Sequence, residues 1–218
     1  MNFLTISNLP IRGEWIRDIW SWVFLLFMVL FFEIWAQVSY SSSFLFNGFN
    51  VQSILIFATA PLLLGIGQSL VIISGGIDLS VGFVMGLSAV VLATAVQSFS
   101  VEADGLALAI GLIITFLVCL IPGFINGFLV TKLKIPPFIG TLGMYGVARG
   151  AGFIIADGMT VPVNNDWLYK IGTGKILGIP ILVLVAIITV IVFHFILSQT
   201  KFGQYTYAIG GNREAAIR

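Results

Sequence analysis

The sequence predicts an all-α fold, a polytopic bundle of about six transmembrane helices, on three observations. Of its 218 residues, 59% are hydrophobic and only 9% are charged, whereas soluble proteins carry about 25% charged residues. The apolar residues gather in stretches of the length that crosses a bilayer, and the few Lys and Arg residues lie mostly between these stretches. The lipid bilayer is therefore the expected surrounding of the chain, and no basic stripe indicates nucleic-acid binding.

Six stretches have the length of about 17 to 25 mostly apolar residues that a transmembrane helix requires. We expect the spans at residues 22–38, 52–73, 79–97, 105–130, 137–155 and 176–197. No polar segment is longer than about 20 residues, which is too short to build a core of its own. The chain is therefore predicted to form one membrane domain.

The distribution of basic residues predicts the orientation of these spans. One side of the membrane receives Arg12, Arg17, Lys132, Lys134, Lys201, Arg213 and Arg218, and the other side receives Lys170 and Lys175. By the positive-inside rule both termini are cytoplasmic. We expect a cytoplasmic segment at residues 1–21, a transmembrane domain at residues 22–197 and a second cytoplasmic segment at residues 198–218. The outer loop at residues 156–175 is either a surface for a periplasmic partner or an ordinary loop.

The sequence SGGIDLSVG at residues 74–82 interrupts an apolar stretch. Asp78 stands where a helix would restart, and its carboxylate can cap that helix by accepting hydrogen bonds from the N–H groups of Ser80 or Val81. The same interruption is typical of a broken helix beside a polar cavity, because irregular backbone is otherwise excluded from the bilayer core. The two interpretations are compatible.

A second polar region lies in the fourth and fifth spans and comprises Asn126, Thr141, Tyr145 and Arg149. Arg149 would lie about 18 Å along the helix from Pro137, well inside the membrane or near its outer half. An arginine at that depth must face protein or water. We expect it to pair with a carboxylate such as Asp78 or Asp157 or with helix C-terminal carbonyls, and direct contact with a solute is the alternative.

The chain ends on a third region of interest. Gly210 and Gly211 predict a turn, and Asn212 is suited to cap a short cytoplasmic helix that begins at about Arg213. Such a helix has only about six residues, whereas isolated helices below about 12 to 15 residues are marginal in water. We therefore expect another component to pack on it, or the natural chain to continue.

Glycines recur at four-residue spacing in three of the spans. Each pair places a flat surface on one helical face, which favours close helix packing, with a substrate path between the helices as the alternative. The pairs are Gly82 and Gly86, Gly123 and Gly127, and Gly146 and Gly150.

Catalytic and metal-binding signatures are missing from the sequence. It has no phosphate loop, no H-E-x-x-H and no G-x-S-x-G, so any ATP hydrolysis is expected on another chain. Cys119 is the single cysteine and is read as a buried structural thiol. His194 has no second ligand at metal-binding spacing and is interpreted as an interfacial polar residue. The sequence predicts neither a catalytic residue nor a metal site.

Three motifs follow one another along the chain. They are SGGIDLSVG at residues 74–82; Asn126-Gly127 with KIPPFIGTLG at residues 134–143 and Arg149-Gly150; and FGQ at residues 202–204 with GGNREAA at residues 210–216. In combination they resemble the ribose/xylose/arabinose class of ABC transporter permeases, over nearly all of the chain after residue 52. The resemblance implies a subunit of a sugar importer in the bacterial inner membrane, carrying a monosaccharide or related polyol.

The resemblance also implies partners. Two such permeases, as a homodimer or a heterodimer, would form the translocation path, a separate ATP-binding subunit would hold ATP and Mg, and a periplasmic sugar-binding protein would deliver the solute. No cofactor is expected on this chain. Family members carry further spans after the coupling segment, so we expect the first part of a larger permease fold, as a truncated form, a fragment or the product of a split gene.

Candidate site residues follow from the same motifs. The residues implied to line the substrate path or to carry the permease motif are Asp78, Ser80, Asn126, Phe138, Thr141 and Arg149. The segment that resembles the helix coupling a permease to its ATPase comprises Gly211, Asn212, Arg213, Glu214, Ala215 and Ala216. Within it, Asn212 would cap the helix, and Arg213 and Glu214 would offer polar contacts to the ATPase.

Three alternatives stay open beside the importer permease. A secondary transporter or channel that works without ATP would favour membrane carboxylates and inverted repeats, and the sequence shows little repetition. An intramembrane enzyme would use Asp78 with Asp157 or His194, although no nucleophile stands beside a base. The third alternative is a truncated remnant that transports nothing.

Overall fold

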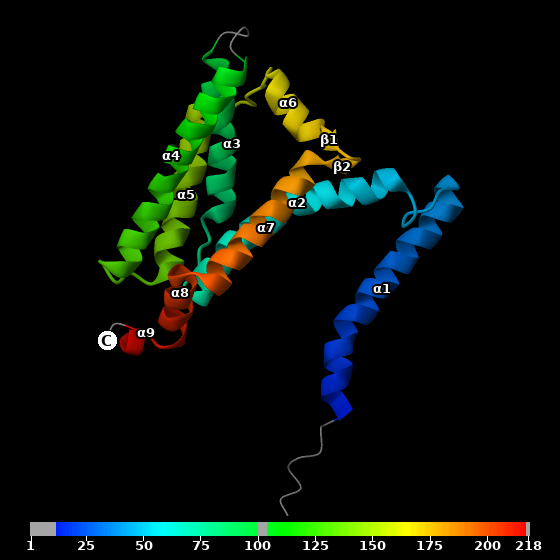
Figure 1. Ribbon diagram of the computed structural model, residues 1–218, viewed down its shortest axis with the longest axis horizontal. Helices are drawn as coiled ribbons and strands as arrows, with labels where there is room; N and C mark the ends of the chain where they lie inside the picture. The colour runs from blue at the N-terminus through cyan, green and yellow to red at the C-terminus, as the bar shows by residue number, and fades with distance from the viewer. Residues whose placement is uncertain (1–11, 100–103, 217–218) are drawn as a thin grey trace, which may run out of the picture. The chain divides into compact units, whose positions relative to one another are not determined.

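The computed structural model describes residues 12–99 and 104–216. The first part of the expected cytoplasmic segment at residues 1–21, most of the turn between the third and fourth expected spans, and Arg218 therefore lie outside the described residues. The chain divides into two compact units, Met1–Leu55 and Ile56–Arg218, which are described separately. Figure 1 shows the course of the chain.

The described elements are almost all helical, which confirms the predicted all-α polytopic fold. Within the described ranges, five helices are long and apolar enough to cross a membrane. A sixth apolar helix, α3, has 17 residues and a length of about 26 Å, close to the bilayer core of about 30 Å. The elements are α1 (Arg12–Tyr40), α2 (Gly48–Ile73), α3 (Val81–Gln97), α4 (Asp104–Thr131), α5 (Pro137–Ile155), α6 (Asp166–Thr173), β1 (Lys175–Ile176), β2 (Ile179–Pro180), α7 (Ile181–Gln199), α8 (Lys201–Gly211) and α9 (Arg213–Ala216).

In the first unit, one carboxylate organises the loop between α1 and α2. Glu33 accepts hydrogen bonds from the backbone N–H groups of Phe44 and Leu45, both at 2.8 Å. The Ser43 hydroxyl and the Gln37 side-chain amide donate to the same carboxylate, at 2.9 and 2.6 Å. A charge near the end of an apolar helix is thereby satisfied by local donors, and the loop is held against α1.

The second unit has its core where α3, α4 and α5 lie side by side (Figure 1). Leu87 and Val91 of α3 enclose Ala148 of α5, which is 1% exposed. On α4, Gly111 faces α3 so closely that an added Cβ would lie 3.0 Å from a Val96 methyl group. Small residues at these contacts let the three helices approach one another.

The paired glycines do not form such contacts. An added Cβ at any of these six glycines would meet no described atom within 4 Å. Their prediction as packing surfaces within this chain is therefore wrong, because the close approaches use other small residues, such as Gly111, Gly152 and Ala148. The paired glycines present open backbone instead.

The predicted start of the sixth span at residue 176 is also wrong. Lys175–Ile176 and Ile179–Pro180 pair as a two-stranded antiparallel hairpin, and α7 begins only after Pro180. Leu177 and Gly178 at the tip both have positive φ, 51° and 82°, as a tight type I′ hairpin turn requires. This local turn withdraws about five apolar residues from the helix.

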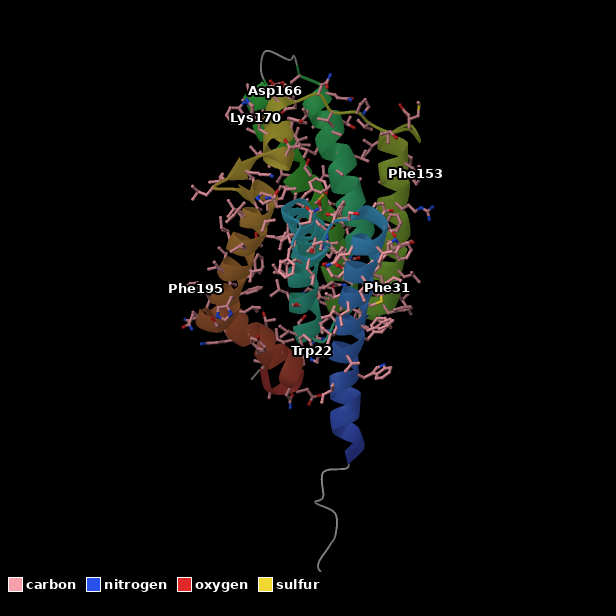
Figure 2. All side chains as sticks on the ribbon, turned by 90° about the vertical axis from the view of Figure 1, so that its right-hand side faces the viewer. Trp22, Phe31, Phe153, Asp166, Lys170 and Phe195 are labelled. Atoms are coloured by element: carbon pink, nitrogen blue, oxygen red, sulfur yellow. The ribbon has the colours of Figure 1, made fainter. Side chains whose placement is uncertain are left out.

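Opposite ends of the second unit carry different polar structures. The helix α6, on which Asp166 and Lys170 lie, is at one end, and α8 and α9 are at the other (Figures 1 and 2). α6 is tied to the start of α4, where Asp104 accepts a hydrogen bond from the Asp166 N–H group at 3.0 Å. Asn165 caps α6 by accepting the Leu168 N–H group at 2.9 Å. The distribution of basic residues predicts that these two ends lie on opposite sides of the membrane.

Enlarging Ala148 tests the core. Ala148→Leu is expected to lower the free energy of unfolding by about 1–3 kcal/mol, because the larger side chain has to displace Leu87 and Val91, which pack on Ala148. Thermal unfolding of the purified chain in detergent measures the change. The matched control is Ala89→Leu, at an exposed position of α3, which is expected to change stability by less than about 0.5 kcal/mol. Equal effects of the two substitutions would contradict the proposed core.

Candidate functional site

Residues 74–80 connect α2 to α3 and are called the elbow here. The N–H groups of residues 74–76 bond the carbonyls of residues 70–72 and close the end of α2. Gly75 has a φ of 82°, a conformation that glycine adopts without the steric cost that a Cβ imposes. The predicted interruption of the helix by two glycines is confirmed.

Asp78 stabilises the restart of the helix. Its Oδ1 atom accepts hydrogen bonds from the Ser80 N–H group at 2.8 Å and from the Ser80 hydroxyl at 2.6 Å. Of the two expected donors, the carboxylate therefore uses Ser80 and not Val81. Ser80 occupies the N-cap position of α3 and is 1% exposed, so Asp78 fixes the residue from which the helix starts.

Side chains from α2 and α5 hold the backbone of the elbow. The Gln68 amide nitrogen of α2 donates to the Asp78 carbonyl. Thr141 of α5, 3% exposed, accepts the Leu79 N–H group at 3.2 Å through its hydroxyl oxygen. That hydroxyl also lies 2.8 Å from the Pro137 carbonyl, to which it donates. Backbone groups that the helix leaves unpaired thus find partners on two neighbouring helices.

Asn126 of α4 completes this cluster. Its Nδ2 atom donates to the Ser80 hydroxyl oxygen at 3.0 Å, and Ser80 in turn donates to Asp78. Asn126 is 7% exposed, and its Oδ1 atom has no hydrogen-bond partner among the described residues. The structure therefore brings together four of the predicted site residues, Asp78, Ser80, Asn126 and Thr141.

Arg149 does not belong to this cluster. It lies two turns further along α5 than Thr141, about 12 Å away along the helix axis. Its guanidinium lies over two aromatic rings, 5.6 Å from the centroid of Phe83 and 5.8 Å from that of Phe153. The expected ion pair with Asp78 or Asp157 is not found in the described part of the chain, because cation–π contacts with α3 and α5 take its place.

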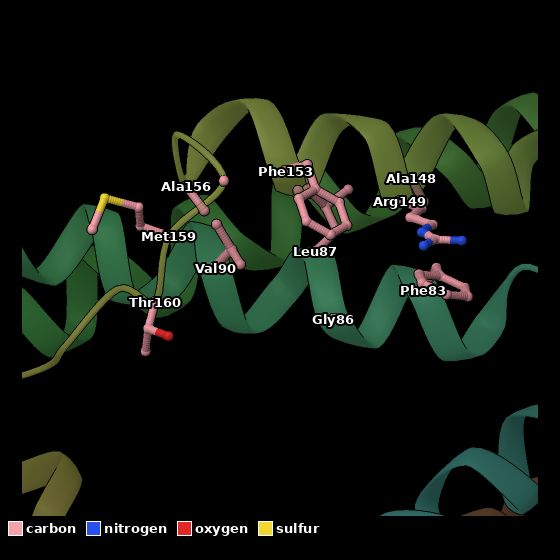
Figure 3. A pocket seen from close by; sticks show the side chains of 12 residues that line it. Phe83, Gly86, Leu87, Val90, Ala148, Arg149, Phe153, Ala156, Met159 and Thr160 are labelled. Carbon is pink, nitrogen blue, oxygen red and sulfur yellow. The ribbon is translucent and has the colours of Figure 1, made fainter.

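A cavity of about 380 Å³ lies beside Arg149, between α3, α5 and the segment that follows α5. Figure 3 shows the guanidinium beside Phe83 at one end, and Met159 and Thr160 at the other. Its wall also includes exposed backbone at Gly86, one of the paired glycines. The volume falls within the range of about 300–1,000 Å³ that small-molecule sites have.

Of the two remaining candidates, one lies beside the Arg149 cavity and the other lies in neither site. Tyr145 packs edge-to-face on Phe83, with ring centroids 4.3 Å apart, and so supports the wall near Arg149. Phe138 is half exposed, at 51%, and is not among the residues that line the cavity or bond the elbow. The structure therefore gives Phe138 no place in either site.

The end of the chain forms two helices where the sequence predicted one. Asn212 accepts the Ala215 N–H group at 3.0 Å and α9 begins at Arg213, which confirms the predicted cap and helix start. Gly210 and Gly211 do not form a turn, because they are the last residues of α8. All residues from Gly211 to Ala216 are exposed.

Comparison with known proteins identifies the family to which the chain belongs. Residues 50–217 match the family described as "Branched-chain amino acid transport system / permease component". The chain belongs to this permease family. The match includes the elbow, the Arg149 cavity and the two C-terminal helices, so each candidate site lies in the part that defines the family.

Individual permeases are similar over much of the chain. The ribose import permease protein RbsC of Bacillus subtilis is 34% identical over 170 residues, 77% of this chain and 51% of that protein. The L-arabinose ABC transporter permease protein AraH of Azospirillum brasilense is 32% identical over 208 residues, covering 94% and 58%. The autoinducer 2 import system permease protein LsrC of Photorhabdus luminescens is 34% identical over 171 residues, covering 77% and 50%.

The chain therefore spans about half the length of the curated relatives that it matches. No solved structure matches it. These relatives are described as permeases, which fits the multi-pass membrane fold.

Sequence reasoning missed residues of both sites, among them Gln68, Phe83 and Phe153. Gln68 is a polar residue within an apolar span, a signal that was available from the sequence. Phe83 and Phe153 gave no signal, because phenylalanine is common throughout this chain and only the packing of α3 on α5 brings both rings to Arg149.

The pair of Ser80 and Asn126 is testable by a double-mutant cycle. Ser80→Ala is expected to cost about 1–3 kcal/mol of unfolding free energy, since it leaves the buried Asn126 amide without an acceptor. Asn126→Ala is also expected to destabilise, and the double variant should cost little more than either single change, because the two residues act as a pair. Thermal unfolding in detergent provides the readout.

Ser88→Ala serves as the control for this cycle, because the Ser88 hydroxyl bonds only a carbonyl of its own helix, that of Met85. It is expected to change stability little. Strictly additive effects of Ser80→Ala and Asn126→Ala would show that the hydrogen bond between them contributes nothing.

Proposed function

We propose that the chain is the permease subunit, or the first part of it, of an ATP-driven importer for a monosaccharide or related polyol. The observation that carries this proposal is the family match over residues 50–217, together with relatives whose names specify ribose and arabinose. Because the chain spans about half of those relatives, a closed translocation path requires further membrane segments from the same protein or from a second permease copy.

The proposed setting is the bacterial inner membrane, with both ends of the chain in the cytoplasm. Basic residues support this orientation, since Lys201 and Arg213 lie on α8 and α9, and Lys170 and Lys175 lie near α6 at the opposite end of the second unit (Figure 1). The Arg149 cavity then opens in the outer half of the membrane, and the elbow lies near its inner face.

The solute path is proposed to pass the Arg149 cavity. A guanidinium presents several N–H donors in a fixed plane, which suit the hydroxyl oxygens of a sugar. Aromatic rings such as Phe83 and Phe153 offer apolar faces to the C–H groups of the same molecule. No described carboxylate pairs with Arg149, so its donors are available to a neutral, hydroxyl-rich solute. The elbow residues are assigned a different role, which is to position α3 against α5.

ATP hydrolysis is proposed to drive transport from the cytoplasmic end of the second unit, where α8 and α9 lie. A separate subunit would bind ATP and Mg and hydrolyse ATP, and a periplasmic sugar-binding protein would deliver the solute from outside. The exposed residues from Gly211 to Ala216 would contact the ATP-binding subunit, with Arg213 and Glu214 as the charged contacts. Closure of the ATP-binding subunits would displace this segment and alternate access to the path.

The proposed solute contact predicts a change in apparent affinity. Arg149→Ala is expected to raise the KM of sugar uptake by about tenfold or more, since a hydrogen bond to a charged group is worth about 1.5–3 kcal/mol. Uptake of radiolabelled sugar into vesicles that contain the assembled transporter measures KM. Lys170→Ala is the matched control, because Lys170 also lies over an aromatic ring, that of Trp167 at 5.3 Å, but outside the cavity. An unchanged KM in Arg149→Ala would contradict a role in solute contact.

The proposed ATPase contact predicts a loss of association. Glu214→Arg is expected to reduce the amount of ATP-binding subunit that co-purifies with the tagged chain by about fivefold or more, because reversing one interfacial charge opposes a complementary surface. Asp166→Arg, the same charge reversal on α6 at the opposite end, is expected to leave co-purification unchanged. Equal recovery of the ATP-binding subunit with Glu214→Arg and with the unaltered chain would remove the coupling role of this segment.

A further inference from the structure

The helix α8 rests on the ends of two other helices through a single face. Gly203 and Thr206 are its buried residues, and Gly210, which is exposed, follows one turn later on the same face, since residues at i, i+3 and i+7 align along a helix. At Gly203 an added Cβ would overlap the Leu197 carbonyl near the end of α7, and at Gly210 it would overlap the Ile73 carbonyl at the end of α2.

Both contacts are between backbones. Glycine is the residue that permits such an approach, because any Cβ at either position would occupy the space of a carbonyl oxygen. No positive φ is involved at Gly203 or Gly210. It is therefore packing, and not backbone conformation, that requires glycine at both positions.

The Ile73 carbonyl, which Gly210 contacts, stands at the end of α2 without a described backbone donor. It is the last carbonyl of α2, and no described backbone N–H group bonds it. A glycine Cα–H group directed at such a carbonyl can supply a weak C–H···O interaction. The same added Cβ would lie 3.6 Å from the Cα atom of Ser74, the first residue of the elbow, so Gly210 touches the chain where the elbow begins.

Beyond Ile73, the elbow is joined to three helices of the second unit by hydrogen bonds. Within seven residues of Ile73, hydrogen bonds join the elbow to Gln68 of α2, Thr141 of α5 and Asn126 of α4. A displacement of α8 therefore reaches the start of α3 through a backbone contact with Ile73 and along the backbone of the elbow. α3 in turn carries Phe83 beneath Arg149.

We propose that Gly210 is a positioning residue that transmits movement of the C-terminal helices to the elbow, and through it to the cavity between α3 and α5. The inference rests on the ATP-driven import proposed above, because it identifies the point at which force from the ATP-binding subunit enters the membrane helices. It assigns Gly210 a role separate from docking, which belongs to the segment from Gly211 to Ala216.

The first measurement uses the unaltered chain and two alanine variants, purified in detergent. Gly210→Ala is expected to increase hydrogen–deuterium exchange at residues 77–80, because α8 must move away from Ile73 to admit the new methyl group. Gly67→Ala is the matched control on α2, where an added Cβ would meet nothing within 4 Å, and it should leave exchange at the elbow unchanged. Identical exchange in the two variants would overturn the proposed contact.

The second measurement separates transmission from docking. In the assembled transporter, Gly210→Ala should retain the ATP-binding subunit at the unaltered ratio and keep the KM for solute, while solute transported per ATP hydrolysed falls by about tenfold, within the usual range of coupling between sites. Gly210→Val should lower it further, and Gly67→Ala should not. A residue needed only for folding would instead reduce the amount of chain in the membrane.

The outcomes also distinguish this inference from the function on which it rests. If the unaltered chain retains an ATP-binding subunit but Gly210→Ala transports as much per ATP as Gly67→Ala, the role of Gly210 is overturned and the importer stands. If the unaltered chain retains no ATP-binding subunit, ATP-driven import itself fails, and transmission through Gly210 fails with it.

Discussion

The elbow depends on one constraint, which is that backbone N–H and C=O groups within a membrane protein need partners. A continuous helix supplies those partners itself, but between Ile73 and Val81 the helix is interrupted and other groups must supply them. Gln68 and Thr141 do so from α2 and α5, and Asn126 of α4 bonds the hydroxyl of Ser80. These hydrogen bonds therefore also fix where α2, α4 and α5 meet the start of α3.

The polar side chains of the two candidate sites lie at two positions along α3 and α5, the elbow and the Arg149 cavity. In and around the elbow, Ser80, Asn126 and Thr141 are buried, and the role proposed for them is to position helices. Arg149, further along α5, lies over two aromatic rings and beside open glycine backbone, where the proposed solute would meet its donors. The helices α3 and α5 pack around Ala148 between the elbow and the cavity, and the proposed transmission would pass through this contact.

Prediction from the sequence succeeded where a residue's role follows from its neighbours in the chain. Asp78 bonds Ser80 two residues away, and Asn212 bonds Ala215 three residues away, so propensity and spacing were sufficient. It failed for Arg149, where an ion pair was expected and aromatic rings from two helices were found. It also missed α8, because the pair Gly210-Gly211 indicates a turn by composition, whereas the contact with Ile73 requires glycine within a helix.

The sequence by itself determined the membrane fold, the approximate spans, the interruption at residues 74–80 and the cap of the last helix, because hydropathy, glycine content and capping act over a few residues. Tertiary structure alone decided which polar residues meet. Asn126 joins Ser80 across 46 positions and Thr141 joins Leu79 across 62, and no local pattern encodes such pairs. They form because lipid offers the elbow no hydrogen bonds, so the helices that can supply them must pack there.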